Sequence, residues 1–173
     1  MSINNDTRYI EVALILENVT AECLKELQDK APIAVFGNGG YYAMTLGQFG
    51  ALLQGVSPNE VLGIAGMESM TVFEYYTLQG LPDFIKTYIE RLQRLTPELT
   101  ADERIGSAMC LPVTAAEGLL LYAREYFGLH SFAEAESIRL SDILIAKKDS
   151  YNALMRQRAQ VVKMKENSKR KRL

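Results

Sequence analysis

The chain has 173 residues, of which 48% are hydrophobic and 23% are charged, a composition typical of one globular domain with a core of its own. Its longest uncharged run, between Lys30 and Glu60, is interrupted by Gly, Asn and Gln, so it is too broken for a membrane helix. The N-terminus lacks the basic start and apolar stretch of a secretion signal. We therefore predict a cytoplasmic protein that does not enter a membrane.

The net charge of −2 conceals a division along the chain. Residues 1–146 carry nineteen acidic and nine basic side chains, whereas residues 147–173 carry two acidic and ten basic ones. Such a difference between segments is typical of an interaction tail. We expect an acidic helical body over residues 1–140. A basic C-terminal helix and tail over residues 141–173 would belong to the same domain or act as a docking arm.

The N-terminal quarter leaves two questions open. The stretch YIEVALIL (Tyr9–Leu16) fits either a strand or the start of a helix that continues into AECLKELQ. The stretch over 33–44, with IAVF, then GNGG, then YYAM, favours a short β-hairpin, because glycines permit the positive φ of a tight turn. GNGG lacks the spacing of a P-loop or a dinucleotide-binding loop, so a turn is favoured over a phosphate site.

Helix-start signals recur from residue 45 onward. In a capping box, Ser or Thr is followed three residues later by Glu or Gln, and the two side chains satisfy each other's backbone N–H groups. The pattern occurs at Thr45/Gln48, Ser57/Glu60, Thr71/Glu74, Thr100/Glu103, Thr114/Glu117 and Ser131/Glu134. Glycines that would end such helices are Gly55, Gly66, Gly80 and Gly128. A new helix is expected after Pro82, ending before Pro97. The sequence thus predicts a mainly α fold: a compact bundle of short helices, with the small N-terminal hairpin and a long C-terminal helix.

The last helix is predicted from Ser141 to about Lys165, with Leu140 and Ile145 placed to form a hydrophobic staple at its start. Its apolar stripe is interrupted by Lys147, Lys148 and Arg158, so this helix cannot be fully buried in its own domain. We expect a partner protein to cover the remainder. The predicted protein-binding residues are Leu154, Met155, Arg158, Val162, Lys169, Arg170, Lys171 and Arg172.

The basic run at the C-terminus has three interpretations: a solvated tail, a docking arm for an acidic protein surface, or a nucleic-acid contact. The last is not favoured, because the run lacks interleaved aromatic residues and a known DNA-reading module.

Residues for catalysis or metal binding are sparse. His130 is the only histidine and stands before the Ser131 helix start, which suggests a loop or cap role. Cys23 and Cys110 lie far apart without a CxxC partner, so we expect two reduced, buried thiols. Most carboxylates fall in first helical turns, where the helix dipole favours negative charge. We predict no catalytic residues, no cofactor and no metal.

The segment LLLYAREYFGLHSFAEAESIRLSDILIAKKDSYNALMRQRAQ (Leu119–Gln160) resembles small helical phage proteins that connect head to tail or assist tail assembly. The resemblance implies a compact helical domain with a C-terminal arm that reaches onto a neighbour, located in the virion if the protein belongs to a phage. We therefore expect a non-enzymatic assembly protein that binds other subunits, as a homo-oligomer or within a larger complex. The alternatives are a nucleic-acid-associated protein using the basic segment, and a small-ligand protein or enzyme with a site near GNGG.

Overall fold

The computed structural model describes residues 3–98, 100 and 113–170, and their side chains as far as Met164. It is mainly helical, as the capping pattern predicts. In chain order the elements are α1 (Tyr9–Leu16), α2 (Ala21–Phe36), the 3-10 turn η1 (Gly40–Ala43), α3 (Leu46–Leu53), α4 (Pro58–Leu62), α5 (Val72–Arg94), α7 (Ala115–Tyr126), α8 (Phe132–Glu136) and α9 (Leu140–Arg170).

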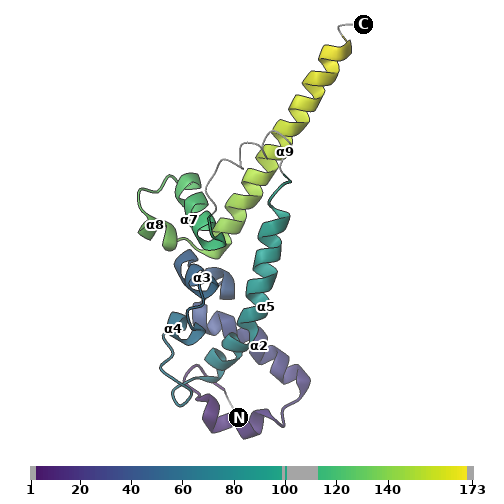
Figure 1. Cartoon of the computed structure of the whole chain (residues 1–173). Helices are drawn as coiled ribbons and strands as arrows, with labels where there is room; N and C mark the ends of the chain where they lie inside the picture. Colours follow the sequence, from purple (N-terminus) through teal and green to yellow (C-terminus); the bar gives the residue numbers. More distant parts are fainter. Residues whose placement is uncertain (1–2, 99, 101–112, 171–173) are drawn as a thin grey trace.

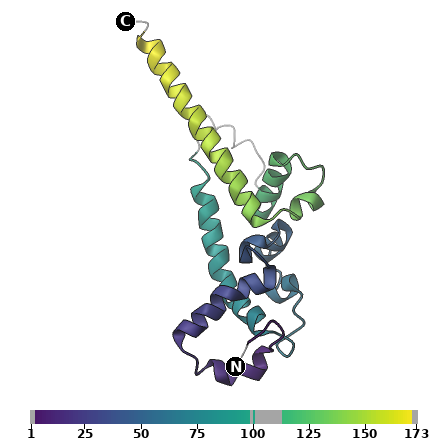
Figure 2. The ribbon, with the colours of Figure 1, turned by 180° about the vertical axis from the view of Figure 1, so that it is seen from behind.

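The molecule is elongated rather than compact. Helices α1 and α2 lie at one end, and α9 projects from the opposite end with the C-terminus at its tip (Figure 1). The same arrangement is visible from behind, with α5 running from the α1–α2 end toward the projecting helix (Figure 2). The fold therefore places the acidic N-terminal helices and the basic C-terminal helix at opposite ends.

The predicted hairpin at 33–44 is wrong. Its first half is the last turn of α2, and its second half is the 3-10 turn η1. The run IAVF continues the apolar row that α2 begins, and a short apolar run has no periodicity that separates strand from helix. Gly37 then ends α2 with a φ of 82°, which a residue with a side chain rarely adopts. Within the described residues there is no strand, only two isolated bridges, Arg8–Thr71 and Thr45–Arg139.

The open question at Tyr9–Leu16 is resolved as a helix that does not continue into the next one. Helix α1 ends at Leu16, and α2 begins anew after Thr20, whose hydroxyl accepts a hydrogen bond from the Cys23 backbone N–H. Thr20 is followed three residues later by Cys23 rather than Glu or Gln, so the capping-box pattern does not find this start.

Most of the predicted helix starts are confirmed. Both hydrogen bonds of the capping box form at Thr45, Thr71, Thr114 and Ser131. Ser57 precedes α4 without a side-chain cap bond, and Pro58 occupies the first helical position. The Thr100/Glu103 box falls partly on residues 101–112, outside the described part of the chain.

Two of the predicted glycine stops follow helix ends, and two do not. Gly55 and Gly128 follow the C-cap residues of α3 and α7, each two residues after the last helical residue. Gly66 lies in the loop beyond α4, which ends at Leu62 with Gly63 as its C-cap. Gly80 lies inside α5, and the helix continues through Pro82 as well, so the break expected between these residues is wrong.

A tertiary contact occupies the space beside Gly80 in α5. The hydroxyl of Tyr41 donates a hydrogen bond of 2.6 Å to the Thr77 carbonyl, in the turn just before Pro82. Burial raises the pKa of Tyr41 to about 12, so the hydroxyl keeps its proton at neutral pH. A Cβ atom added at Gly80 would lie 2.6 Å from the Tyr41 hydroxyl oxygen. The missing side chain therefore makes room for this contact.

We predict that Gly80→Ala destabilises the protein by about 1–3 kcal/mol, because the new methyl group overlaps the Tyr41 hydroxyl. In an open helix the same change stabilises by about 0.5–1 kcal/mol, which is the result expected for the control Gly118→Ala in α7. Urea unfolding measures both. Tyr41→Phe removes the overlapping oxygen, so the Tyr41→Phe/Gly80→Ala double variant should lose less than the two single losses added together. A stabilising Gly80→Ala would contradict the proposed contact.

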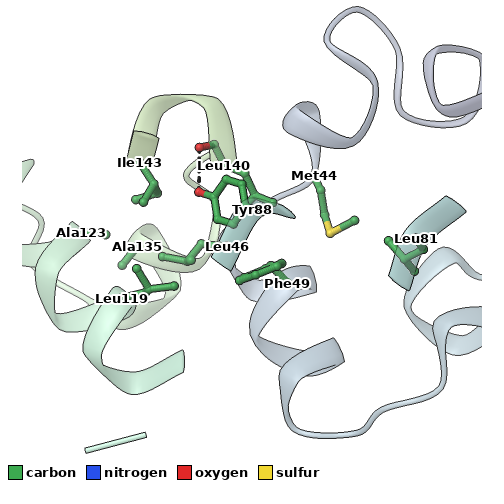
Figure 3. Packing of buried hydrophobic residues seen from close by; sticks show 10 residues of the cluster. All are labelled: Met44, Leu46, Phe49, Leu81, Tyr88, Leu119, Ala123, Ala135, Leu140 and Ile143. Carbon is green, nitrogen blue, oxygen red and sulfur yellow. Dashed lines mark hydrogen bonds between the residues drawn. The ribbon is translucent and has the colours of Figure 1, made fainter. Parts of the chain in front are cut away.

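Helix α5 connects two apolar clusters. The first, at the α1–α2 end, consists of Val12, Leu16, Ala31, Val72, Phe73 and Tyr76. The second lies toward α9 and consists of Met44, Leu46, Phe49, Leu81, Tyr88, Leu119, Ala123, Ala135, Leu140 and Ile143 (Figure 3). Because Val72, Phe73 and Tyr76 belong to the first cluster and Leu81 and Tyr88 to the second, α5 holds the two ends of the molecule together.

Tyr88 is the largest fully buried side chain of the second cluster. Its hydroxyl donates a hydrogen bond of 2.9 Å to the carbonyl of Leu140, the first residue of α9 (Figure 3). Burial raises the pKa of Tyr88 above its usual value, so the group donates throughout the neutral range.

We predict that Tyr88→Phe destabilises the protein by about 0.5–1.5 kcal/mol, because a buried hydrogen bond is lost while the Leu140 carbonyl keeps its bond within α9. Tyr122→Phe, which removes a half-buried hydroxyl bonded to the Ser150 side chain, is the control and should cost less. If denaturant unfolding gives the same loss of unfolding free energy for both variants, the buried bond stabilises the protein no more than the half-buried one.

Candidate docking surface on the C-terminal helix

The first turns of α9 are fixed to the body. The Leu140 N–H donates 3.0 Å to the Met44 carbonyl, and the Ile138 carbonyl accepts 2.8 Å from the Leu46 N–H. Leu140, Ile143 and Ala146 are buried. The predicted staple does not form, because Ile145 is 68% exposed while Leu140 is in the core. Backbone pairing with the segment before α3, rather than a local staple, anchors the start of this helix.

Lys147, the first charged residue in the apolar stripe of α9, packs against α7. The Lys147 ammonium nitrogen lies 3.6 Å from the centre of the Tyr122 ring, within the range of a cation–π contact. The side chain is half-buried, and this burial lowers the pKa of Lys147. Ser150 and Asp149 on the same turn make hydrogen bonds of 2.8 and 3.0 Å with the hydroxyls of Tyr122 and Tyr126. Lys148 is exposed.

Arg158, a second charged residue in this stripe, also has a partner within the chain. It is half-buried, and its Nη2 donates 3.1 Å to the carbonyl of Glu98, in the segment after α5. A shallow groove of about 390 Å³ lies beside it, lined by Thr100, Leu154, Gln157, Arg158, Val161 and Val162. Sequence spacing alone could not show that two of the three interrupting cations have partners in other segments.

The structure brings three of the predicted binding residues together. Leu154, Arg158 and Val162 line the groove at intervals of four residues along α9, whereas Met155 does not line it. Val162 is 55% exposed and Val161 is also exposed. Lys169 and Arg170 lie in the last turn of α9, and Lys171 and Arg172 fall outside the described residues. Val161 belongs to the groove at seven residues from Leu154, a helical spacing that the predicted site omitted.

A second apolar surface, missed in the sequence, lies at the other end of the molecule. On α1 the side chains of Ile10, Leu14 and Ile15 are exposed, Leu14 by 78%. Beside them, α1 and α2 form an open groove of about 470 Å³ lined by Ile3, Val12, Ile15, Leu16, Val19, Cys23, Glu26, Leu27 and Lys30. The available signal was that YIEVALIL is apolar on all sides of a helix, more than one buried face requires.

The cysteine prediction is corrected at Cys23, which is exposed and lines this groove. Cys23 lies in the first turn of α2, on the wall of the open groove, and this open side accounts for its exposure. Cys110 falls outside the described residues.

The glycine-rich turn and the lone histidine have structural roles. Gly40 packs against Pro32, where an added Cβ would lie 3.3 Å from the proline Cβ. The backbone N–H of His130 donates 2.8 Å to Glu134, which extends the capping box at Ser131 as predicted for a cap position. In the described part of the chain, no group of three or more His, Cys, Asp or Glu side chains could hold a metal ion.

Comparison with protein-family models, with curated proteins and with solved structures finds no match to this chain. Over the described residues, every helix is too short or too polar to cross a membrane.

Proposed function

We propose that this chain is a non-enzymatic assembly protein that docks onto a larger complex through the distal half of α9, in several copies. The observation that carries the proposal is the contrast along this helix. Its first two turns bury Leu140, Ile143 and Ala146 in the body, whereas Val161 and Val162 remain exposed on a face that also carries Arg158. An amphipathic helix with anchors at such spacing is a common binding element for a groove on another protein.

The length of α9 supports this role. At about 1.5 Å per residue, its 31 residues extend about 46 Å. Arg158 bonds the Glu98 carbonyl in the segment after α5, and the twelve residues of α9 beyond Arg158 extend about 18 Å further. Figures 1 and 2 both show this part projecting away from the short helices of the body. A helix of this kind presents its side chains at a defined distance and direction.

The charge of the arm indicates the chemistry of its partner. Residues 152–173 carry eight basic side chains and one acidic one. Together with the exposed valines, this composition fits an acidic protein surface that has an apolar centre. A narrower form of the proposal, a connector or assembly factor of a phage particle, rests on the resemblance of Leu119–Gln160 alone.

We predict that deleting residues 160–173 leaves the body folded and abolishes assembly. The capping boxes, both apolar clusters and the anchors of α9 all precede residue 160. The thermal unfolding midpoint should stay within a few degrees of the full chain, while light scattering and co-purification from the native source should show loss of the complex.

A matched pair of single substitutions refines this test. Val162→Asp should weaken assembly at least tenfold, whereas Gln160→Asp makes the same charge change about 200° around the helix and should leave it intact. Normal assembly of the truncated chain would refute the docking function.

We predict that partner binding falls only partly as salt is raised from about 50 to about 500 mM, because salt screens exposed charges and does not weaken apolar contacts. Binding to nucleic acid through phosphates would instead fall by several orders of magnitude over the same range. Titrations with the native partner and with duplex DNA, at both salt concentrations, compare the two. Tight, steeply salt-dependent DNA binding would replace this proposal with the nucleic-acid alternative.

A further inference from the structure

The groove between α1 and α2 combines an apolar floor with a charged edge. Ile15, Val19 and Leu27 contribute to the floor, and Glu26 lies at the edge, paired with Lys30 at 2.5 Å. Both side chains of this ion pair are well exposed, so it is weak and can exchange partners. The groove is therefore accessible both to an apolar side chain and to a charged one.

The surroundings of the groove are acidic. Residues 1–30 carry six acidic and three basic side chains. Glu22 precedes Glu26 by four residues and shares its side of α2, while Glu11 precedes Ile15 by four residues on α1. All three glutamates are exposed. This surface is complementary in charge to the arm, whose exposed apolar residues are flanked by lysine and arginine.

The groove and the arm of one molecule cannot meet. They lie at opposite ends of the structure in both views (Figures 1 and 2), and α9 is a continuous helix that points away from α1. Bringing its distal half to the groove would require breaking this helix and its anchors at Met44 and Tyr88. Contact between the two surfaces therefore requires two copies of the chain.

We propose that the α1–α2 groove receives the distal half of α9 from a second copy of this protein. This inference rests on the proposed docking function and names the acceptor surface. Val162 and its neighbours contact the apolar floor, and the basic side chains contact Glu11, Glu22 and Glu26. Because the two surfaces differ, the contact is head-to-tail, and repetition produces a closed ring or an open filament.

Cys23 provides a direct test, because it is exposed and lines the groove. In the full-length chain with Cys110→Ser, the added substitution Val162→Cys places a second thiol on the arm. A disulfide requires the two Cα atoms to come within about 7 Å, so it forms only if the arm occupies the groove. Mild oxidation in a glutathione buffer should give a ladder of covalent oligomers. Peptide mass spectrometry should then identify a disulfide between Cys23 of one copy and the thiol introduced by Val162→Cys in another.

The matched control is Gln160→Cys, which carries an exposed thiol about 200° around α9. Its cross-linking yield should be at least tenfold lower, since collision alone would link both variants equally. In a second arm of the experiment, Ile15→Glu should reduce oligomers of the otherwise native chain at least tenfold, whereas Ile145→Glu, at an exposed position of α9, should not. Equal cross-linking of the two cysteine variants would overturn the inference.

The outcomes separate this inference from the docking function. If the full chain assembles and loses assembly on deletion of 160–173, yet the Val162→Cys variant does not cross-link to Cys23, the arm docks elsewhere and the groove assignment is wrong. If the truncated chain still assembles, the docking function itself fails, whatever the cross-linking result.

Discussion

The buried hydrogen bond from the Tyr88 hydroxyl to the Leu140 carbonyl joins α5 and α9, the two long helices that meet at the base of the arm. It stands within an apolar cluster to which α3, α5, α7, α8 and α9 all contribute. A buried hydroxyl without a partner is costly, so the position of α9 on α5 is favoured where this bond can form. The direction in which α9 projects from the body depends on this junction.

Helix α5 transmits that constraint to the far end of the molecule. Its N-terminal half packs on α1 and α2, and its C-terminal half reaches the α9 junction. It continues without a break through Gly80, beside which the Tyr41 hydroxyl lies, and through Pro82. An unbroken helix keeps the two apolar clusters at a fixed separation. The groove between α1 and α2 and the basic end of α9 are thereby held apart within one molecule.

The basic residues of α9 fall into two groups, those with a partner in the same chain and those that follow them toward the C-terminus. Lys147 and Arg158 are held by an aromatic ring and a backbone carbonyl of the same chain, so they stabilise the attachment of the helix. The lysines and arginines beyond Arg158 lie on the part of α9 that follows these two contacts. A charge on an apolar stripe is therefore evidence for a partner only after the chain's own acceptors have been placed.

The sequence by itself determined the helical class, four capping boxes and the charge division, because each depends on residues close together in the chain. Only the tertiary structure decided that IAVF ends a helix, that Gly80 lies inside one, and that Lys147 has a partner. The Tyr41 hydroxyl beside Gly80 and the Tyr122 ring beside Lys147 belong to distant segments, and local periodicity carries no information about such contacts. The exposed groove beside Cys23 likewise exists only where α1 packs against α2.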